Sequence, residues 1–167
     1  MPNANSNRLT RILFVCTFQG ARSLIAKGYA DRLGSDRVES FCSGFEEGWL
    51  SARMKDLIRE DSLSVKVEEL VNVFDRHQRH EQFDYVISLC QSASNEQCSV
   101  FQACLNTLYA STAIRKDWSI PDFTPIEGDD EQWLLEARKI RETIKSKVES
   151  LIAQLDLEPS FSESAAA

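Results

Sequence analysis

The sequence predicts one α/β domain, with a central parallel sheet of about four strands and helices on both faces. Short apolar runs of strand length alternate with helical patterns, which is typical of parallel strands joined by helices. The 167 residues suit a single domain, and 43% hydrophobic with 27% charged residues is the usage of an ordinary folded domain. We expect flexible tails at 1–8 and 158–167, and one domain over 9–157 with no repeat or linker inside it.

The elements in the first half are predicted in this order. Residues 11–15 form a short apolar run between polar residues, which indicates a buried strand. A helix is expected at 23–33, with Ser23 as a candidate cap and Gly34 as its end. A second strand and helix follow at 37–43 and 51–61. Residues 65–73 suit either a short helix or a strand.

The second half contains one more strand and a long helix. Residues 76–82 are too polar for a core element, 84–89 read as a third strand, and 98–113 have room for a helix. Apolar residues then recur every three or four positions from Trp133 to Leu155. This spacing predicts a long amphipathic helix over that range, with one apolar face.

The charge of the chain limits its partners. With 19 Lys and Arg against 26 Asp and Glu, the formal net charge is −7. Nucleic acids and anionic membranes need a basic surface, so neither is an expected partner. The polar N-terminus lacks the apolar centre of a signal peptide, and no apolar run is long enough to cross a bilayer. We therefore expect a cytoplasmic protein.

Five cysteines are the unusual feature of the composition. An odd number in a reducing compartment argues against a disulfide framework. Cys42 and Cys104 have apolar or small neighbours that suit packing. Cys16 and Cys90 each follow a predicted strand, at the sheet edge where ligands bind in parallel α/β folds. This position predicts that Cys16 and Cys90 share a site.

The loop from Cys16 to Ser23 has the composition of an oxyanion site. Arg22 follows Cys16 by six residues, and a helix N-terminus there would offer free N–H groups and the positive end of its dipole. The same field would favour the thiolate of Cys16, the nucleophilic form. We predict that the loop binds a small oxyanion through Thr17, Phe18, Gln19, Gly20, Ala21, Arg22 and Ser23.

At these residues the chain resembles the low-molecular-weight protein tyrosine phosphatase superfamily, and within it the thioredoxin-coupled arsenate reductases. The resemblance covers about residues 11–155. It includes the Cys-x5-Arg-Ser loop, the segment 83–101 with Cys90 and Cys98, and the Trp118-Ser-Ile-Pro-Asp122 segment that looks like the family's acid loop. No cofactor is implied, and Lys27 stands where many reductases carry a Glu that helps to bind potassium.

The resemblance implies a reductase that works by thiol exchange. Cys16 would attack arsenate while Asp122 protonates the departing oxygen, and Cys90 would then release arsenite. Cys98 would take over the disulfide, and a thioredoxin-like protein would reduce it.

Several alternatives stay open at this stage. A phosphatase acting on phosphotyrosine proteins or small aryl phosphates needs only Cys16, Arg22 and Asp122, and the unusual Phe18-Gln19 pair leaves room for a module that merely binds an oxyanion. The acid could instead be Asp117, Asp129 or Asp130, and Cys42 or Cys104 could replace Cys98. His77 and His80 are three residues apart, but no third ligand accompanies them, so no metal site is expected.

Overall fold

The computed structural model describes residues 8–17, 20–46, 49–91 and 96–157 of the chain. Within these ranges the elements follow in the order β1 (Thr10–Val15), α1 (Ala21–Gly34), β2 (Val38–Gly44), α2 (Ala52–Glu60), a 3-10 turn (Val67–Glu69), β3 (Leu70–Asn72), α3 (Val73–Gln78), β4 (Tyr85–Ser88), α4 (Glu96–Tyr109), β5 (Ile114–Asp117) and α5 (Asp130–Leu157). Residues 1–7 and 158–167 of the predicted tails lie outside the described residues.

The five strands form one parallel sheet in the order β3-β2-β1-β4-β5. The chain builds outward from β1 through β2 to β3, and then returns to the other side of β1 to place β4. Val15 at the end of β1 therefore pairs with Ser43 on one side and with Ser88 on the other. Between β1 and β4 the strand order reverses, and such a point opens a crevice at the carboxyl ends of the strands.

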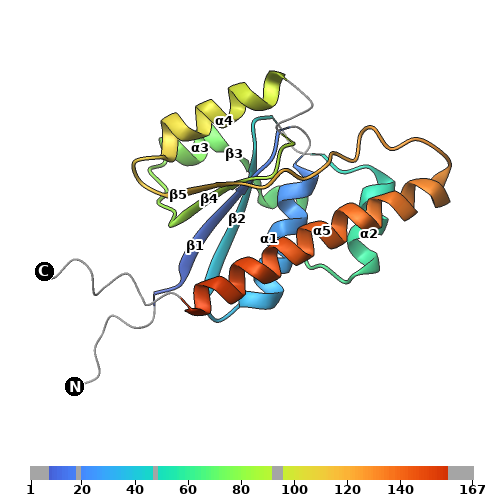
Figure 1. Ribbon diagram of the computed structural model, residues 1–167, viewed down its shortest axis with the longest axis horizontal. Helices are drawn as coiled ribbons and strands as arrows, with labels where there is room; N and C mark the ends of the chain where they lie inside the picture. The colour runs from blue at the N-terminus through green and yellow to red at the C-terminus, as the bar shows by residue number, and fades with distance from the viewer. Residues whose placement is uncertain (1–7, 18–19, 47–48, 92–95, 158–167) are drawn as a thin grey trace, which may run out of the picture.

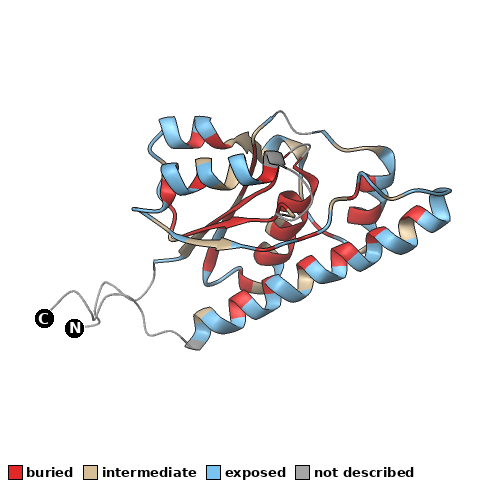
Figure 2. Ribbon diagram, turned by 45° about the horizontal axis from the view of Figure 1, so that its top comes forward, coloured by how far each residue is buried: buried red, intermediate tan, exposed pale blue. Residues whose placement is uncertain are grey.

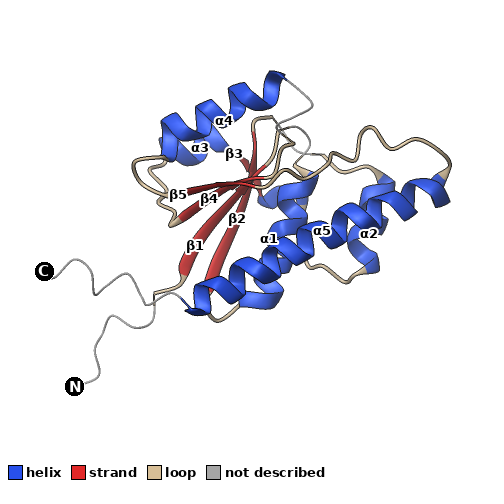
Figure 3. Cartoon of the chain, in the orientation of Figure 1, coloured by secondary structure: helices blue, strands red, loops and turns tan. Residues whose placement is uncertain are grey.

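Helices cover both faces of the sheet (Figures 1 and 3). Helices α1 and α5 lie on one face, with α2 packed against α5, and α3 and α4 lie on the other face. Alternate residues of β1 serve the two layers: Ile12 and Phe14 belong to the core under α1 and α5, and Leu13 and Val15 to the core under α3 and α4. A strand buried on both faces has no polar side, which explains its continuous apolar run.

Helix α1 is buried on most of its surface because it lies between the sheet and α5 (Figure 2). Helix α5 buries one stripe only, which includes Ala137, Ile144 and Val148. The amphipathic pattern that predicted α5 is confirmed. Among the described helices, none is long and apolar enough to cross a membrane.

The predicted fold class is confirmed, as are the three strands and three helices expected with definite ranges, to within a few residues at their ends. The ambiguous segment 65–73 contains the 3-10 turn, β3 and the first residue of α3. Two details are wrong. The segment 76–82 does contribute to the interior, because Arg76 of α3 is buried. Ser23 is not the cap of α1, because that helix begins at Ala21 after Gly20.

Candidate active site

Cys16 and Cys90 lie at the same edge of the sheet, where the strand order reverses. Cys16 follows β1 directly, and Cys90 is the second residue after β4. The Leu89 N–H donates to the Val15 carbonyl at 2.8 Å, which continues the pairing of β1 and β4 to the start of both loops. The sequence-based placement of these two cysteines at one edge is confirmed.

Hydrogen bonds to β2 and α1 hold Cys16 in place. Its N–H donates to the Ser43 carbonyl at 3.2 Å, and its thiol donates to the Ser23 hydroxyl at 3.4 Å. The Ser23 hydroxyl in turn lies 2.9 Å from the Gly20 carbonyl and 3.2 Å from that of Ser43. A hydroxyl can rotate, so Ser23 can accept from the Cys16 thiol or donate to its thiolate.

Gly20 turns the loop into helix α1. Its φ of 75° lies in the left-handed region, and its carbonyl accepts from the Leu24 N–H at 3.0 Å. The first turn of α1, which includes Ala21, Arg22 and Ser23, contains no acidic residue. Its N–H groups and the helix dipole therefore suit an anion, as predicted from the sequence. Phe18 and Gln19, which belong to the predicted binding loop, lie outside the described residues.

Arg22 joins three segments at the site. The residue is only 4% exposed. Nη1 donates to the carbonyls of Leu89 at 3.2 Å and Ile120 at 2.9 Å, and Nη2 donates to the Thr17 hydroxyl at 3.3 Å. Leu89 precedes Cys90, and Ile120 lies two residues before Asp122. Arg22 thus holds the oxyanion loop, the end of β4 and the acid loop together.

Cys98 lies beside Cys90 in the first turn of α4. The two side chains are hydrogen-bonded, and burial together with the charge of Cys90 raises the pKa of the Cys98 thiol to about 11. Arg22 opposes this rise and Asp122 adds to it, so both groups act on Cys98 electrostatically. The Cys90 thiol also lies 3.0 Å from the Ser88 hydroxyl. The structure therefore brings Cys90, Cys98, Arg22 and Asp122 into one cluster.

Asp122 occupies the loop between β5 and α5. This loop leaves the sheet at Trp118, whose N–H donates to the Ser88 carbonyl at 2.7 Å. The Asp122 carboxylate accepts from the Thr124 N–H at 3.3 Å and is half-buried. Because the loop is tied to Arg22 through Ile120, Asp122 stays on the side of the cysteines.

The three other candidate acids, Asp117, Asp129 and Asp130, have partners of their own. Asp117 pairs with Arg115 at 2.7 Å, and Asp130 pairs with Arg53 at 2.6 Å. The Asp129 carboxylate accepts from the Gln132 N–H at 2.9 Å and so caps α5. These contacts make Asp122 the best-placed acid of the four.

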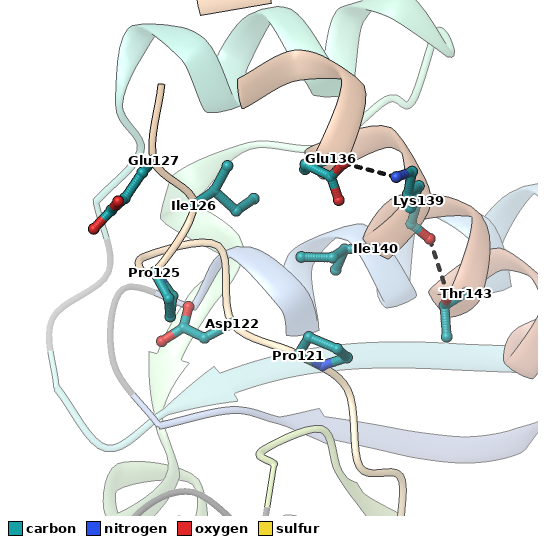
Figure 4. Close-up of a pocket in the computed structure, with 9 residues that line it drawn as sticks. All are labelled: Pro121, Asp122, Pro125, Ile126, Glu127, Glu136, Lys139, Ile140 and Thr143. Carbon is teal, nitrogen blue, oxygen red and sulfur yellow. Dashed lines mark hydrogen bonds and ion pairs between the residues drawn. The ribbon is translucent and has the colours of Figure 1, made fainter. Parts of the chain in front are cut away.

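A cavity of about 410 Å³ opens between the acid loop and α5 (Figure 4). Asp122, Glu127 and Glu136 line it, and Lys139 pairs with Glu136 at 2.7 Å. Carboxylates predominate among its charged groups, and no cysteine lines it. An oxyanion would be repelled there, so the cationic loop after β1 is the better anion site.

The other two cysteines and the two histidines do not join the cluster around Cys90. The Cys42 thiol contacts the Glu69 carbonyl at 3.5 Å, and burial raises its pKa to about 12. Cys104 is partly exposed on α4, so its assignment to packing holds only in part. His77 packs edge-on against Tyr109, whereas His80 lies beyond the end of α3, so the two do not share a helix face.

Other aromatic and charged residues near the site also have partners. Phe123, the residue after Asp122, is buried against Trp133. Lys27 pairs with Asp31 at 2.5 Å and lies 3.5 Å from Glu69. Sequence reasoning gave no role to Ser43, Ser88 or Arg76, although all three are buried next to site residues. The available signal for the two serines was their place at the end of a buried strand, since Ser88 is the last residue of β4 and Ser43 the last but one of β2.

Comparisons with known proteins agree with this arrangement. The family model described as low molecular weight phosphotyrosine protein phosphatase matches residues 11–160. A glutaredoxin arsenate reductase of Synechocystis sp. is 25% identical over 149 residues, which cover 88% of this chain and 99% of that protein. An arsenate reductase of Bacillus licheniformis is 24% identical over 137 residues, covering 82% and 91%.

Solved structures show the same architecture. An arsenate reductase in its phosphate-binding state superimposes with a TM-score of 0.64 at 25% identity, covering 87% of this chain and 98% of that one. An arginine phosphatase from Geobacillus stearothermophilus superimposes with a TM-score of 0.58 at 18% identity, covering 88% and 93%. The second likeness extends to the fold alone.

Proposed function

Because this chain belongs to the low-molecular-weight phosphotyrosine protein phosphatase family, we propose that its loop serves an arsenate reductase that works through Cys16, Cys90 and Cys98. The observation that carries the proposal is the Cys90–Cys98 thiol pair beside Arg22. Phosphate ester hydrolysis has no use for two further thiols at the oxyanion loop. Reduction of arsenate consumes two electrons, which a pair of thiols supplies.

The first step is nucleophilic attack. The Cys16 thiolate forms a bond to arsenic while Arg22 and the N–H groups of α1 hold the remaining oxygens. One oxygen leaves, and Asp122 donates the proton that converts it to water. The product is an arsenate thioester on Cys16, in which arsenic is still in its oxidised state.

The second step transfers electrons. The Cys90 thiolate attacks the sulfur of Cys16, and the sulfur–arsenic bond breaks with its electron pair left on arsenic. Arsenite is released, and Cys16 and Cys90 are oxidised to a disulfide. Cys98 then attacks the sulfur of Cys90, so Cys16 leaves as a thiolate and the disulfide moves to Cys90 and Cys98.

The neighbouring thiol Cys90 affects how readily Cys98 loses its proton. Burial and the charge of Cys90 raise the pKa of the Cys98 thiol to about 11, so this thiol is protonated at neutral pH as long as Cys90 is reduced. A disulfide at Cys90 removes that charge, which makes the thiolate of Cys98 easier to form. Oxidation of Cys90 therefore favours attack by Cys98, while burial continues to raise the pKa of the Cys98 thiol.

An external dithiol must return the enzyme to its reduced form. We propose thioredoxin for this role, in the cytoplasm where such reductants act, with a glutaredoxin as the competing reductant. The two are separated by supplying either the thioredoxin system or glutathione with glutaredoxin, and measuring arsenite formed per minute.

The reductase proposal is tested by replacing single thiols. In Cys90→Ser and in Cys98→Ser, multiple-turnover arsenate reduction should fall at least about 100-fold, since the relay is broken. Cys104→Ser, on the same helix as Cys98 and partly exposed, is the matched control and should keep its rate.

Peptide mass mapping after exposure to arsenate gives a second test. The wild-type protein should contain a Cys90–Cys98 disulfide, and the Cys98→Ser variant should accumulate Cys16–Cys90 instead. Full turnover in Cys90→Ser and Cys98→Ser, with no such disulfides, would refute the reductase.

The alternative function is a phosphatase, favoured by the fact that Cys16, Arg22 and Asp122 suffice for it. Hydrolysis of an aryl phosphate such as p-nitrophenyl phosphate would then survive in Cys90→Ser and Cys98→Ser and disappear in Cys16→Ser. A protein that only binds oxyanions would turn over neither substrate. The same set of variants therefore separates all three functions.

A further inference from the structure

Arg76 of α3 is a buried cation that has no place in the steps above. It is 6% exposed, and its helix α3 lies with α4 on one face of the sheet (Figure 1). Nε donates to the Ser43 hydroxyl at 2.8 Å, and Nη2 donates to the carbonyls of Cys42 at 3.1 Å and Glu69 at 3.3 Å. Nη1 pairs with Glu81 at 2.7 Å. The guanidinium is therefore directed mainly at the end of β2.

Ser43 connects Arg76 to the oxyanion loop. The side chain of Ser43 accepts from Arg76, and its backbone carbonyl accepts from the Cys16 N–H and the Ser23 hydroxyl, each at 3.2 Å. The nucleophile and the hydroxyl that contacts its sulfur are thus both held by one residue. The position of that residue is fixed from the opposite side by Arg76.

A second contact from the same segment reaches the loop at Thr17. The side-chain amide of Asn72 donates to the Phe45 carbonyl at 3.2 Å, and the Phe45 N–H donates to the Thr17 carbonyl at 3.2 Å. Segment 72–76 therefore contacts Ser43 in β2 and Phe45 just after it, and these two residues each hold the loop through a backbone hydrogen bond.

A buried ion pair is a poor way to gain stability alone, because removing both charges from water costs about as much as their attraction returns. An apolar side chain would fill the same space between α3 and the sheet. What an arginine adds is a rigid, planar set of donors that fixes several acceptors at once.

We propose that Arg76 is a positioning residue, which acts through Ser43 to hold Cys16 and Ser23 in the geometry that binds an oxyanion. This proposal rests on the proposed function only in requiring that the loop binds oxyanions, and not on the later thiol exchange. Donors that are already in place when the anion arrives lose little free energy to reorganisation.

The test measures oxyanion binding directly. Cys16 is alkylated with iodoacetamide at increasing concentrations of inorganic phosphate, and the modified peptide is quantified by mass. The variants are Arg76→Gln, Ser43→Ala, which deletes only one oxygen, and the double variant. Arg79→Gln is the matched control, because Arg79 is an exposed arginine at the end of the same helix.

Arg76→Gln and Ser43→Ala should each raise the phosphate concentration for half protection about tenfold, the loss expected for one charge-assisted hydrogen bond. The double variant should need no more phosphate for half protection than the more impaired single variant, because both changes interrupt the same chain of contacts. Arg79→Gln should match the wild-type protein. Urea unfolding of each variant separates lost stability from lost binding.

Three results would overturn the proposal: half protection within twofold of wild type in Arg76→Gln, independent losses that add in the double variant, or a wild-type protein that phosphate does not protect. Arsenite formation is measured alongside. Phosphate protection that depends on Arg76, in a protein that forms no arsenite, would refute the reductase and leave the role of Arg76 supported.

Discussion

Replacing Gly20 with alanine should weaken both the fold and the oxyanion loop. Gly20 has a φ of 75°, and a Cβ built there would lie 2.5 Å from Cδ2 and 2.6 Å from Cδ1 of Leu70. The left-handed conformation costs a residue with a Cβ about 1–2 kcal/mol. The methyl group adds about 1 kcal/mol of crowding, at the low end because Leu70 is half-buried and its side chain can rotate.

The net loss should be about 2 kcal/mol, because alanine also restricts the unfolded chain and so recovers about 0.4–1 kcal/mol. Urea unfolding measures this loss. Gly44→Ala is the matched control: Gly44 is also close to the loop, but its Cβ would meet nothing nearer than the Glu46 carbonyl at 3.4 Å. Gly44→Ala should not lower the free energy of unfolding by more than about 0.5 kcal/mol, because the same restriction of the unfolded chain offsets any crowding there.

The two contributions at Gly20 can be separated with a second substitution. In a Leu70→Ala background the crowding disappears, so Gly20→Ala should cost only the conformational part, about 1 kcal/mol. Phosphate protection of Cys16 should stay weakened in that background, because the carbonyl of Gly20 orients Ser23. Complete recovery of stability by Leu70→Ala, or a loss under about 0.5 kcal/mol in the single variant, would refute the assigned strain.

Three further predictions concern stability. Burial raises the pKa of the Cys42 thiol from 9.0 to about 12, so its contribution is full below pH 9 and is lost as pH rises toward 12; Cys42→Ala should flatten this decline in urea unfolding between about pH 8 and 10.5. Hydrogen bonds from two arginines lower the pKa of Glu60 from 4.5 to about 2, so its contribution is lost as pH falls from 4.5 toward 2. Acid unfolding of Glu60→Gln should accordingly show a shallower slope in that range, and an unchanged slope would contradict the assignment. Ile144→Ala, at a fully buried position of α5, should lower the free energy of unfolding by about 2–4 kcal/mol, whereas Leu135→Ala, at an exposed position of the same helix, should change it by less than about 0.5 kcal/mol.

The elements with strong apolar patterns could be predicted from the sequence, and the edges of the sheet could not. Strands β1 and β4 are buried on both faces, so each shows as a continuous apolar run. Strand β5 consists of Ile-Arg-Lys-Asp, because an edge strand is only partly covered. Strand β3 has three residues, too few for any periodicity to show.

Some residues of the candidate site could likewise be predicted from the sequence, and others could not. The loop from Cys16 to Arg22 is visible because its residues are contiguous, and its place follows from the strand before it. Arg76 is not visible, because its role depends on Ser43, which lies 33 positions earlier in the chain and meets it only in the folded sheet. The start of α1 was placed too late, since a glycine in the left-handed region let the helix begin two residues before the serine that resembled a cap.

The contacts of Arg22 have a consequence for the energetics of the whole site. The guanidinium that should grip the oxyanion already donates to the carbonyls of Leu89 and Ile120. Anion affinity and the positions of the two flanking segments are therefore linked thermodynamically, and the coupling is reciprocal. An anion that draws Arg22 toward itself would weaken the hydrogen bond to Leu89, next to Cys90. A change at Cys90 that displaces Leu89 would in turn alter the affinity for the anion by the same factor. If the loop binds an oxyanion as proposed, one arginine thereby couples occupancy of the loop to the state of the thiols beside it.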